Sequence, residues 1–133
     1  MTTRNTAPLT ALTLTTTADA CVVVATSGTR TWTRRFTGGD RCERAGYFIR
    51  QVKAVRERAD HVALLFAEEQ RPVEYVRVGY RFVVEGSVVQ VETSRGSGER
   101  QVFGLSRPGG GRVEVTRPQL LQGQRDRRLV CLF

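Results

Sequence analysis

The chain has 133 residues, of which 40% are hydrophobic, a size and composition typical of one small domain with its own core. It carries 21 basic and 13 acidic residues, so its formal net charge is +8, which is compatible with an acidic protein partner or with nucleic acid. The 3 cysteines lie far apart and there is 1 histidine, which argues against a structural zinc site and a disulfide framework. No apolar run approaches the roughly 20 residues that a membrane-spanning helix needs.

We expect residues 1–8 to form a flexible N-terminus and residues 9–133 to form a single domain. Three strands are predicted at its start, where β-branched residues are dense or apolar residues alternate with polar ones; they cover residues 9–17, 20–26 and 29–36. Asp19 and the Ser27-Gly28 pair separate these strands, because such residues favour turns.

The next segment predicts one more strand and a helix. Residues 47–55 are interpreted as a strand of mixed periodicity. A short helix is predicted to begin at Asp60, whose carboxylate can accept a hydrogen bond from an unpaired backbone N–H of the first turn. Val62, Leu65 and Phe66 form its expected apolar stripe, and a helix this short must dock on a sheet.

Residues 72–93 have the clearest pattern of the chain, two antiparallel strands joined at Gly86-Ser87. The first strand alternates between an apolar face and a polar face, and the polar face contains Arg77, Gly79, Arg81 and Glu85. Further strands are predicted at residues 101–106, 112–116 and 129–133. About seven strands and one helix predict a mainly β, α+β fold: an antiparallel β-barrel or strongly curled sheet with one short docked helix.

Nothing in the sequence reads as an active site. His61 is expected at the surface, with no nucleophile near it in the chain. The strand acids stand singly, whereas a barrel that hydrolyses triphosphates carries paired metal-binding acids; they are Glu74, Glu85, Glu92 and Glu114. Glycines 109–111 lack the GK[ST] of a phosphate-binding loop and are interpreted as a flexible linker. We therefore predict a protein that is not an enzyme, with no catalytic residue, metal or cofactor.

Arginines alternate with aromatic residues between Arg30 and Phe36, as in grooves that bind single-stranded nucleic acid. Trp32 and Phe36 nevertheless fall on one strand face, which is more often a core feature. A small basic β-barrel that binds RNA or DNA, with an affinity that falls steeply with salt, is therefore an alternative hypothesis.

From Trp32 onward the order of residues resembles Mediator complex subunit 18, a family in the head module of the RNA polymerase II coactivator. The resemblance covers residues 30–93 and rests on four successive segments. These are WTRRFTGGD (Trp32, Arg35, Phe36, Gly38), then Phe48, Ile49 and Arg50, then ADHVALLFAEEQ, and finally Glu74, Tyr75, Val76, Gly79, Tyr80 and Phe82 followed by VVEGSVVQVET.

The resemblance implies an antiparallel β-barrel with helical additions, a nuclear location and a non-catalytic role in regulating transcription by RNA polymerase II. It also implies two protein partners, Mediator subunit 20 and a helix of subunit 8, without direct contact to nucleic acid or membrane. Arg77 and Arg81, on the polar face of the hairpin strand, are the candidate partner-binding residues, at the rim of a contact with acidic partners.

Overall fold

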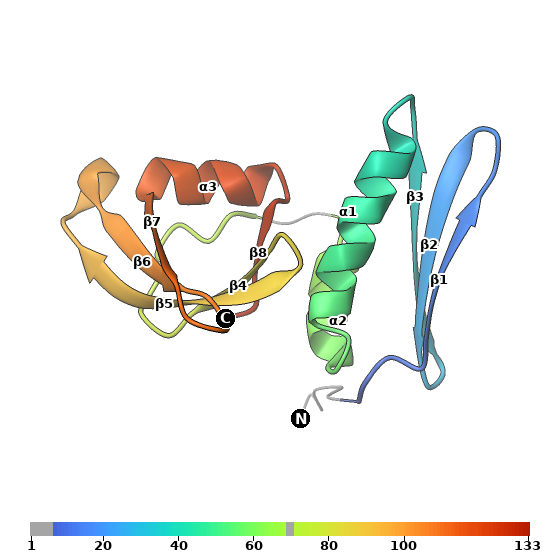
Figure 1. The fold of residues 1–133 in the computed structure, drawn as a ribbon, viewed down its shortest axis with the longest axis horizontal. Coiled ribbons are helices and arrows are strands. Elements are labelled where there is room, and N and C mark those ends of the chain that lie inside the picture. Colours follow the sequence, from blue (N-terminus) through green and yellow to red (C-terminus); the bar gives the residue numbers. More distant parts are fainter. Residues whose placement is uncertain (1–6, 69–70) are drawn as a thin grey trace. The chain divides into compact units, whose positions relative to one another are not determined.

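The computed structural model describes residues 7–68 and 71–133 (Figure 1). The chain divides into two compact units, residues 1–67 and 68–133, and each unit has its own antiparallel sheet. The predicted α+β class, with more strands than helices, is confirmed. Within the described ranges, neither sheet closes into a barrel. The single domain over residues 9–133 stays a prediction, and residues 1–6 of the expected flexible terminus lie outside the described ranges.

The first unit begins with a three-stranded meander in the order β1-β2-β3. The strands are β1 (Ala11–Thr16), β2 (Ala20–Ser27) and β3 (Arg30–Thr37). Val23 of β2 lies opposite both Leu14 and Arg34, so these three side chains share one face of the sheet. The three strands predicted at the start of the chain are confirmed. Their β-branched residues suit the pleated surface of a sheet.

Two helices follow, α1 (Arg41–Ala54) and α2 (Ala59–Phe66), and α1 packs against β2 and β3 (Figure 1). The strand predicted at residues 47–55 is therefore wrong. Ala45, Phe48 and Val52 are buried at spacings of three and four residues, which is the period of a helix face. The Phe48 ring lies 5.5 Å from Phe36 and 4.9 Å from Phe66, so α1 supplies the centre of this unit's aromatic cluster.

The helix predicted to run from Asp60 to the Arg71-Pro72 pair is present as α2, but it already ends at Phe66 and its N-cap is Arg58 and not Asp60. Asp60 lies in the first turn, where its Oδ1 accepts from the backbone N–H of His61 at 3.1 Å. Its two carboxylate oxygens also accept from the Arg58 guanidinium, at 3.1 and 2.7 Å. Burial raises the pKa of Asp60, but the Arg58 hydrogen bonds, the charges of His61 and Arg58 and the His61 N–H outweigh it, so the pKa lies below its usual value.

The second unit has a five-stranded antiparallel sheet in the order β7-β6-β5-β4-β8. The strands are β4 (Arg81–Val84), β5 (Ser87–Arg95), β6 (Val102–Ser106), β7 (Arg112–Thr116) and β8 (Leu129–Cys131), with a 3-10 turn at Gly98–Arg100. Strands predicted at residues 101–106, 112–116 and 129–133 are confirmed as β6, β7 and β8. One sheet face packs into a core completed from outside the strands by Val76 and Leu120.

The predicted hairpin is also present, but its first strand is shorter than expected because β4 begins only at Arg81. The backbone N–H of Tyr80 donates to the carbonyl of Arg77 at 3.1 Å, and Gly79 has a φ of +99°. This turn interrupts the alternation, and Val78 is 58% exposed although the pattern placed it on the apolar face.

The helix α3 (Arg117–Arg125) follows β7 without a linker, and we did not predict it. Thr116 caps it, because the Thr116 hydroxyl accepts from the N–H of Gln119 at 3.3 Å while the Gln119 side chain accepts from the N–H of Thr116 at 2.9 Å. Leu120 is 1% exposed and joins the core under the sheet. The sequence TRPQ, with its proline in the first turn, is the signal that could have revealed this helix.

Candidate functional site

The residues weighed as catalytic do not form a site in the described part of the chain. His61 is buried at 8% exposure, so its expected surface position is wrong. The described ranges contain no group of three or more His, Cys, Asp or Glu side chains that could hold a metal ion. Glycines 109–111 all have positive φ and close the β6–β7 hairpin, where the N–H of Arg107 donates to the carbonyl of Gly111 at 2.9 Å.

The arginine and aromatic residues of β3 serve the packing of the first unit. Trp32 is half-buried, and its ring centroid lies 6.5 Å from that of Phe66. The Arg34 guanidinium lies 5.4 Å from the Phe36 ring and 5.0 Å from the Phe48 ring, and it donates to the backbone carbonyl of Leu65 at 3.3 Å. These contacts hold α2 against β3, and they occupy the rings that would otherwise stack on a base.

The two predicted partner-binding residues lie in different elements of the second unit. Arg77 is exposed and lies at the turn that precedes β4. Arg81 is the first residue of β4, and its neighbour Phe82 points into the core. Because successive side chains of a strand point to opposite faces, Arg81 lies on the sheet face turned away from that core.

A row of polar side chains crosses this face through four adjacent strands. Arg81 of β4 lies opposite Gln90 of β5, Gln90 lies opposite Ser106 of β6, and Ser106 lies opposite Arg112 of β7. Beyond a bulge in β5, Thr93, Gly104 and Glu114 form a second row, and Arg95 begins a third. We call this set the polar face: Arg81, Gln90, Thr93, Arg95, Ser106, Arg112 and Glu114. Figure 1 shows α3 on the opposite side of the same sheet.

Hydrogen bonds order the side chains of the polar face. Arg112 Nη2 donates to Thr93 Oγ1 at 2.8 Å. A Cβ at Gly104 would lie 2.3 Å from Thr93 Oγ1 and 2.9 Å from Arg112 Nε, so the absence of a side chain there lets Arg112 lie along the sheet. Arg95 Nη2 lies 2.9 Å from Glu114 Oε2, and both side chains are more than half exposed, so this pair adds little stability.

The polar face has a positive charge excess and a regular spacing. Its members include three arginines and one acid, Glu114, among hydroxyl and amide groups that can donate hydrogen bonds, and a second acid, Glu92, is exposed at the β5 bulge beside Thr93. Three strand spacings of about 4.8 Å place the backbones of Arg81 and Arg112 about 14 Å apart. Arg95 and Arg112 were missed in the sequence because the strands that carry them were interpreted separately. The alternation within each strand indicates its faces, but only the pairing shows that the arginines share one face.

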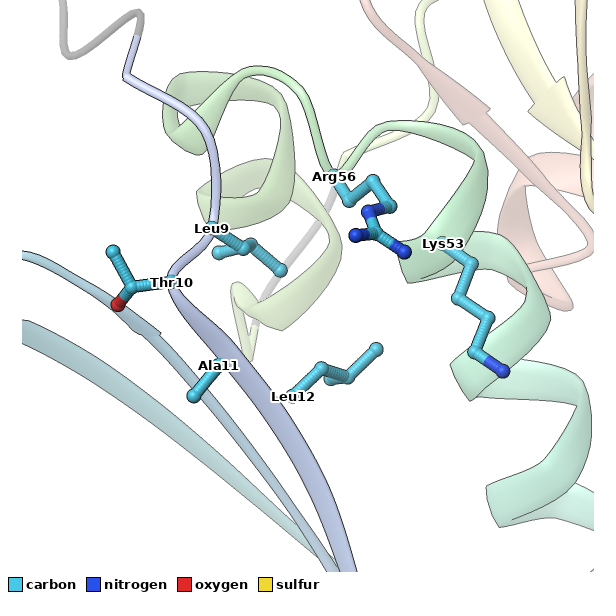
Figure 2. Close-up of a pocket in the computed structure, with 6 residues that line it drawn as sticks. All are labelled: Leu9, Thr10, Ala11, Leu12, Lys53 and Arg56. Carbon is cyan, nitrogen blue, oxygen red and sulfur yellow. The ribbon is translucent and has the colours of Figure 1, made fainter.

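The first unit has one further feature, a cavity of about 230 Å³ between the start of β1 and the end of α1 (Figure 2). Leu9 and Leu12 form its apolar wall, and Lys53 and Arg56 lie on the α1 side. Both cations are exposed, and Arg56 Nε lies 4.0 Å from Glu57 Oε1. The cavity is smaller than the roughly 300 Å³ at which small-molecule sites begin, so we consider the polar face the stronger candidate.

Comparisons of the chain with protein-family models, with curated proteins and with solved structures find no match. None of the helices in the described ranges is long and apolar enough to cross a membrane. The functional argument therefore depends on the chemistry of the polar face itself.

Proposed function

We propose that this protein is a non-catalytic nucleic-acid-binding protein and that its polar face contacts the phosphate backbone. The observation that carries the proposal is the register that aligns Arg81, Gln90, Ser106 and Arg112 across four strands. Arginine, glutamine, serine and threonine side chains are the groups that donate hydrogen bonds to phosphate oxygens in protein–DNA complexes. The formal charge of +8 adds a favourable long-range attraction.

The composition of the face supports nucleic acid over a protein partner. A protein interface is organised around buried aromatic or large aliphatic side chains, which supply most of its affinity. The seven members of the polar face are charged, hydroxyl or amide residues, and the large aliphatic residues on the same side of the sheet in β4 and β8, Val83 and Val130, are buried. Phosphate recognition needs no apolar centre, because charge neutralisation and counterion release drive the association.

The spacing of the arginines suits a duplex. Arg81 and Arg112 stand at opposite ends of the polar row, about 14 Å apart by strand spacing. The major groove of B-DNA is about 12 Å wide, and the long arginine side chains can close the difference. We therefore expect each of the two guanidinium groups to contact a phosphate on a different side of one groove.

The proposal is tested by fluorescence anisotropy with a labelled duplex of about 20 base pairs. Two phosphate contacts, from Arg81 and Arg112, predict a slope of log affinity against log salt of about −1.8, so the affinity falls about 12-fold between about 50 and about 200 mM salt. The triple variant R81A/R95A/R112A should lose this slope. A control variant R71A/R100A/R125A removes the same charge from other exposed positions of the second unit and should retain most of it. Equal loss in both variants, or no binding by the native protein, would contradict the proposal.

A subunit of the Mediator head is the second candidate, favoured by the order of residues between Trp32 and Thr93. The barrel, the nuclear location and the partner subunits 20 and 8 all stay predictions of that resemblance. Arg77, exposed at the turn before β4, would be its candidate contact with an acidic partner. Co-purification of the tagged chain with the head subunits would favour this candidate, whereas a protein outside the nucleus without those subunits would exclude it.

A further inference from the structure

Two cysteine thiols meet at the junction of β2 and α1 in the first unit. Cys21 Sγ and Cys42 Sγ lie 3.5 Å apart, and neither cysteine forms a disulfide. Cys21 lies in β2 and is 1% exposed, whereas Cys42 is the second residue of α1 and is exposed. The Cys42 thiol is therefore accessible to a reagent in solution, whereas the neighbouring Cys21 thiol is buried.

We propose that Cys21 and Cys42 form a reversible redox pair, in which an internal disulfide joins β2 to α1 under oxidising conditions. A disulfide has an S–S distance of about 2.05 Å, so the two sulfur atoms must approach by about 1.5 Å. Cys42 lies in the first turn of its helix, where the side chain is exposed and can change rotamer. The pair has the arrangement of a redox-sensitive cysteine beside its resolving cysteine.

The oxidant we assign is a small disulfide such as oxidised glutathione. The thiolate of exposed Cys42 attacks one glutathione sulfur, so a Cys42–glutathione bond forms and one glutathione thiol leaves. The thiolate of Cys21 then attacks Cys42 Sγ, which releases the second glutathione thiol and forms the internal bond. The two protein thiols are oxidised by two electrons, one glutathione disulfide is reduced to two thiols, and the two protons pass to the departing thiolates.

The surroundings of Cys42 favour its thiol form, so its reaction with an oxidant should become faster as the pH rises. A hydrogen bond with Cys21, the negative charge of a Cys21 thiolate and burial raise the pKa of Cys42, although the charge of Arg41 opposes this effect. Cys131 is 8% exposed and belongs to the core of the second unit, so it is not expected to compete for the reagent.

The disulfide would tie the central strand of the first sheet to the helix that packs on it. It would close a loop of about 20 residues that contains all of β3, and such a link restricts the unfolded chain. We expect the oxidised protein to unfold at a Tm about 10 °C above that of the reduced protein.

The test treats the reduced full-length chain with excess oxidised glutathione and follows intact mass and Tm. The native protein and the C131A variant should each lose two hydrogen atoms in mass and gain in Tm, and adding a dithiol should reverse both changes. C42A, which changes only an exposed side chain, should show neither change. C21A should stop at a glutathione adduct on Cys42; if C21A does not fold, the C42A comparison still decides the matter. A stable glutathione adduct on the native protein, or a disulfide without a change in Tm, would overturn the proposal.

Discussion

Arg112 Nη2 donates to Thr93 Oγ1 at 2.8 Å across the backbone of Gly104, so residues of β7 and β5 meet above β6. The guanidinium is held along the sheet instead of extending into solvent. An arginine that is ordered before binding loses less conformational entropy when it contacts a phosphate. Gly104 is the residue that makes this arrangement possible, because any Cβ there would enter the space of the two side chains.

Replacing Gly104 with alanine should weaken nucleic-acid binding about as much as Arg112→Ala does. The new Cβ would lie 2.3 Å from Thr93 Oγ1, so the hydroxyl and the guanidinium must move apart. Anisotropy with the labelled duplex measures the change, and Gly39→Ala, where no atom lies within 4 Å of the added Cβ, is the matched control. An affinity that is unaltered in Gly104→Ala would show that the order of Arg112 does not matter.

Replacing Glu114 with glutamine should strengthen binding and steepen its salt dependence. The change removes the acid that is paired with Arg95 and releases Arg95 from its 2.9 Å ion pair. One additional phosphate contact corresponds to a slope increment of about −0.9. Glu99→Gln, an exposed acid of the 3-10 turn outside the polar face, is the control for the change in net charge. If both variants gain equally, the effect is one of total charge and not of this site.

Gly46→Ala should stabilise the protein by about 0.5–1 kcal/mol, because glycine inside a helix costs backbone entropy relative to alanine. Gly46 lies in the middle of α1, and no atom lies within 4 Å of the position its Cβ would occupy. Urea unfolding followed by circular dichroism measures the difference. A loss of stability would show that this position of α1 requires glycine.

Asp60→Asn should destabilise the protein by about 1 kcal/mol at pH 7, because the neutral amide loses the charge-assisted pair of hydrogen bonds with the Arg58 guanidinium. The folded-state pKa of Asp60 is lowered, so its stabilising contribution is present above the unfolded-state pKa of about 3.9 and is lost as pH falls through the folded-state value. The free energies of unfolding of the variant and the native protein should therefore converge at acidic pH. Asp19→Asn, at an exposed turn, is the control, and a difference that persists below about pH 2 would contradict this account.

The strands were predictable wherever local chemistry decided the structure. The β-branched run of β2 and the alternation of β3 indicated strands, and the structure has them. Phe48 lies in a segment where apolar residues fit both periods, and only packing against Phe36 and Phe66 selects the helix. At Gly79, a left-handed φ ends a pattern that looked continuous, which composition alone does not indicate.

The polar face was only partly accessible to sequence analysis. Arg81 was singled out from the alternation around it, and it does lie on the polar side of its strand. The sequence could not show that Arg112 shares a sheet face with Arg81, because only the order of four strands places both residues on that face. Strand order depends on long-range pairing and on the α3 connection that carries the chain from one edge strand, β7, to the other, β8. The TRPQ signal of that helix was visible and was overlooked.

Thr116 is both the last residue of β7 and the N-cap of α3, so no spacer separates a strand of the sheet from the helix that covers it. One extra residue at this junction would rotate the whole helix by about 100° and turn Leu120 out of the interior. Homologous or engineered chains should therefore keep a constant length here and vary instead at the glycine hairpin between β6 and β7. Grafting this unit onto another protein would require β7 and α3 to be moved as one inseparable piece.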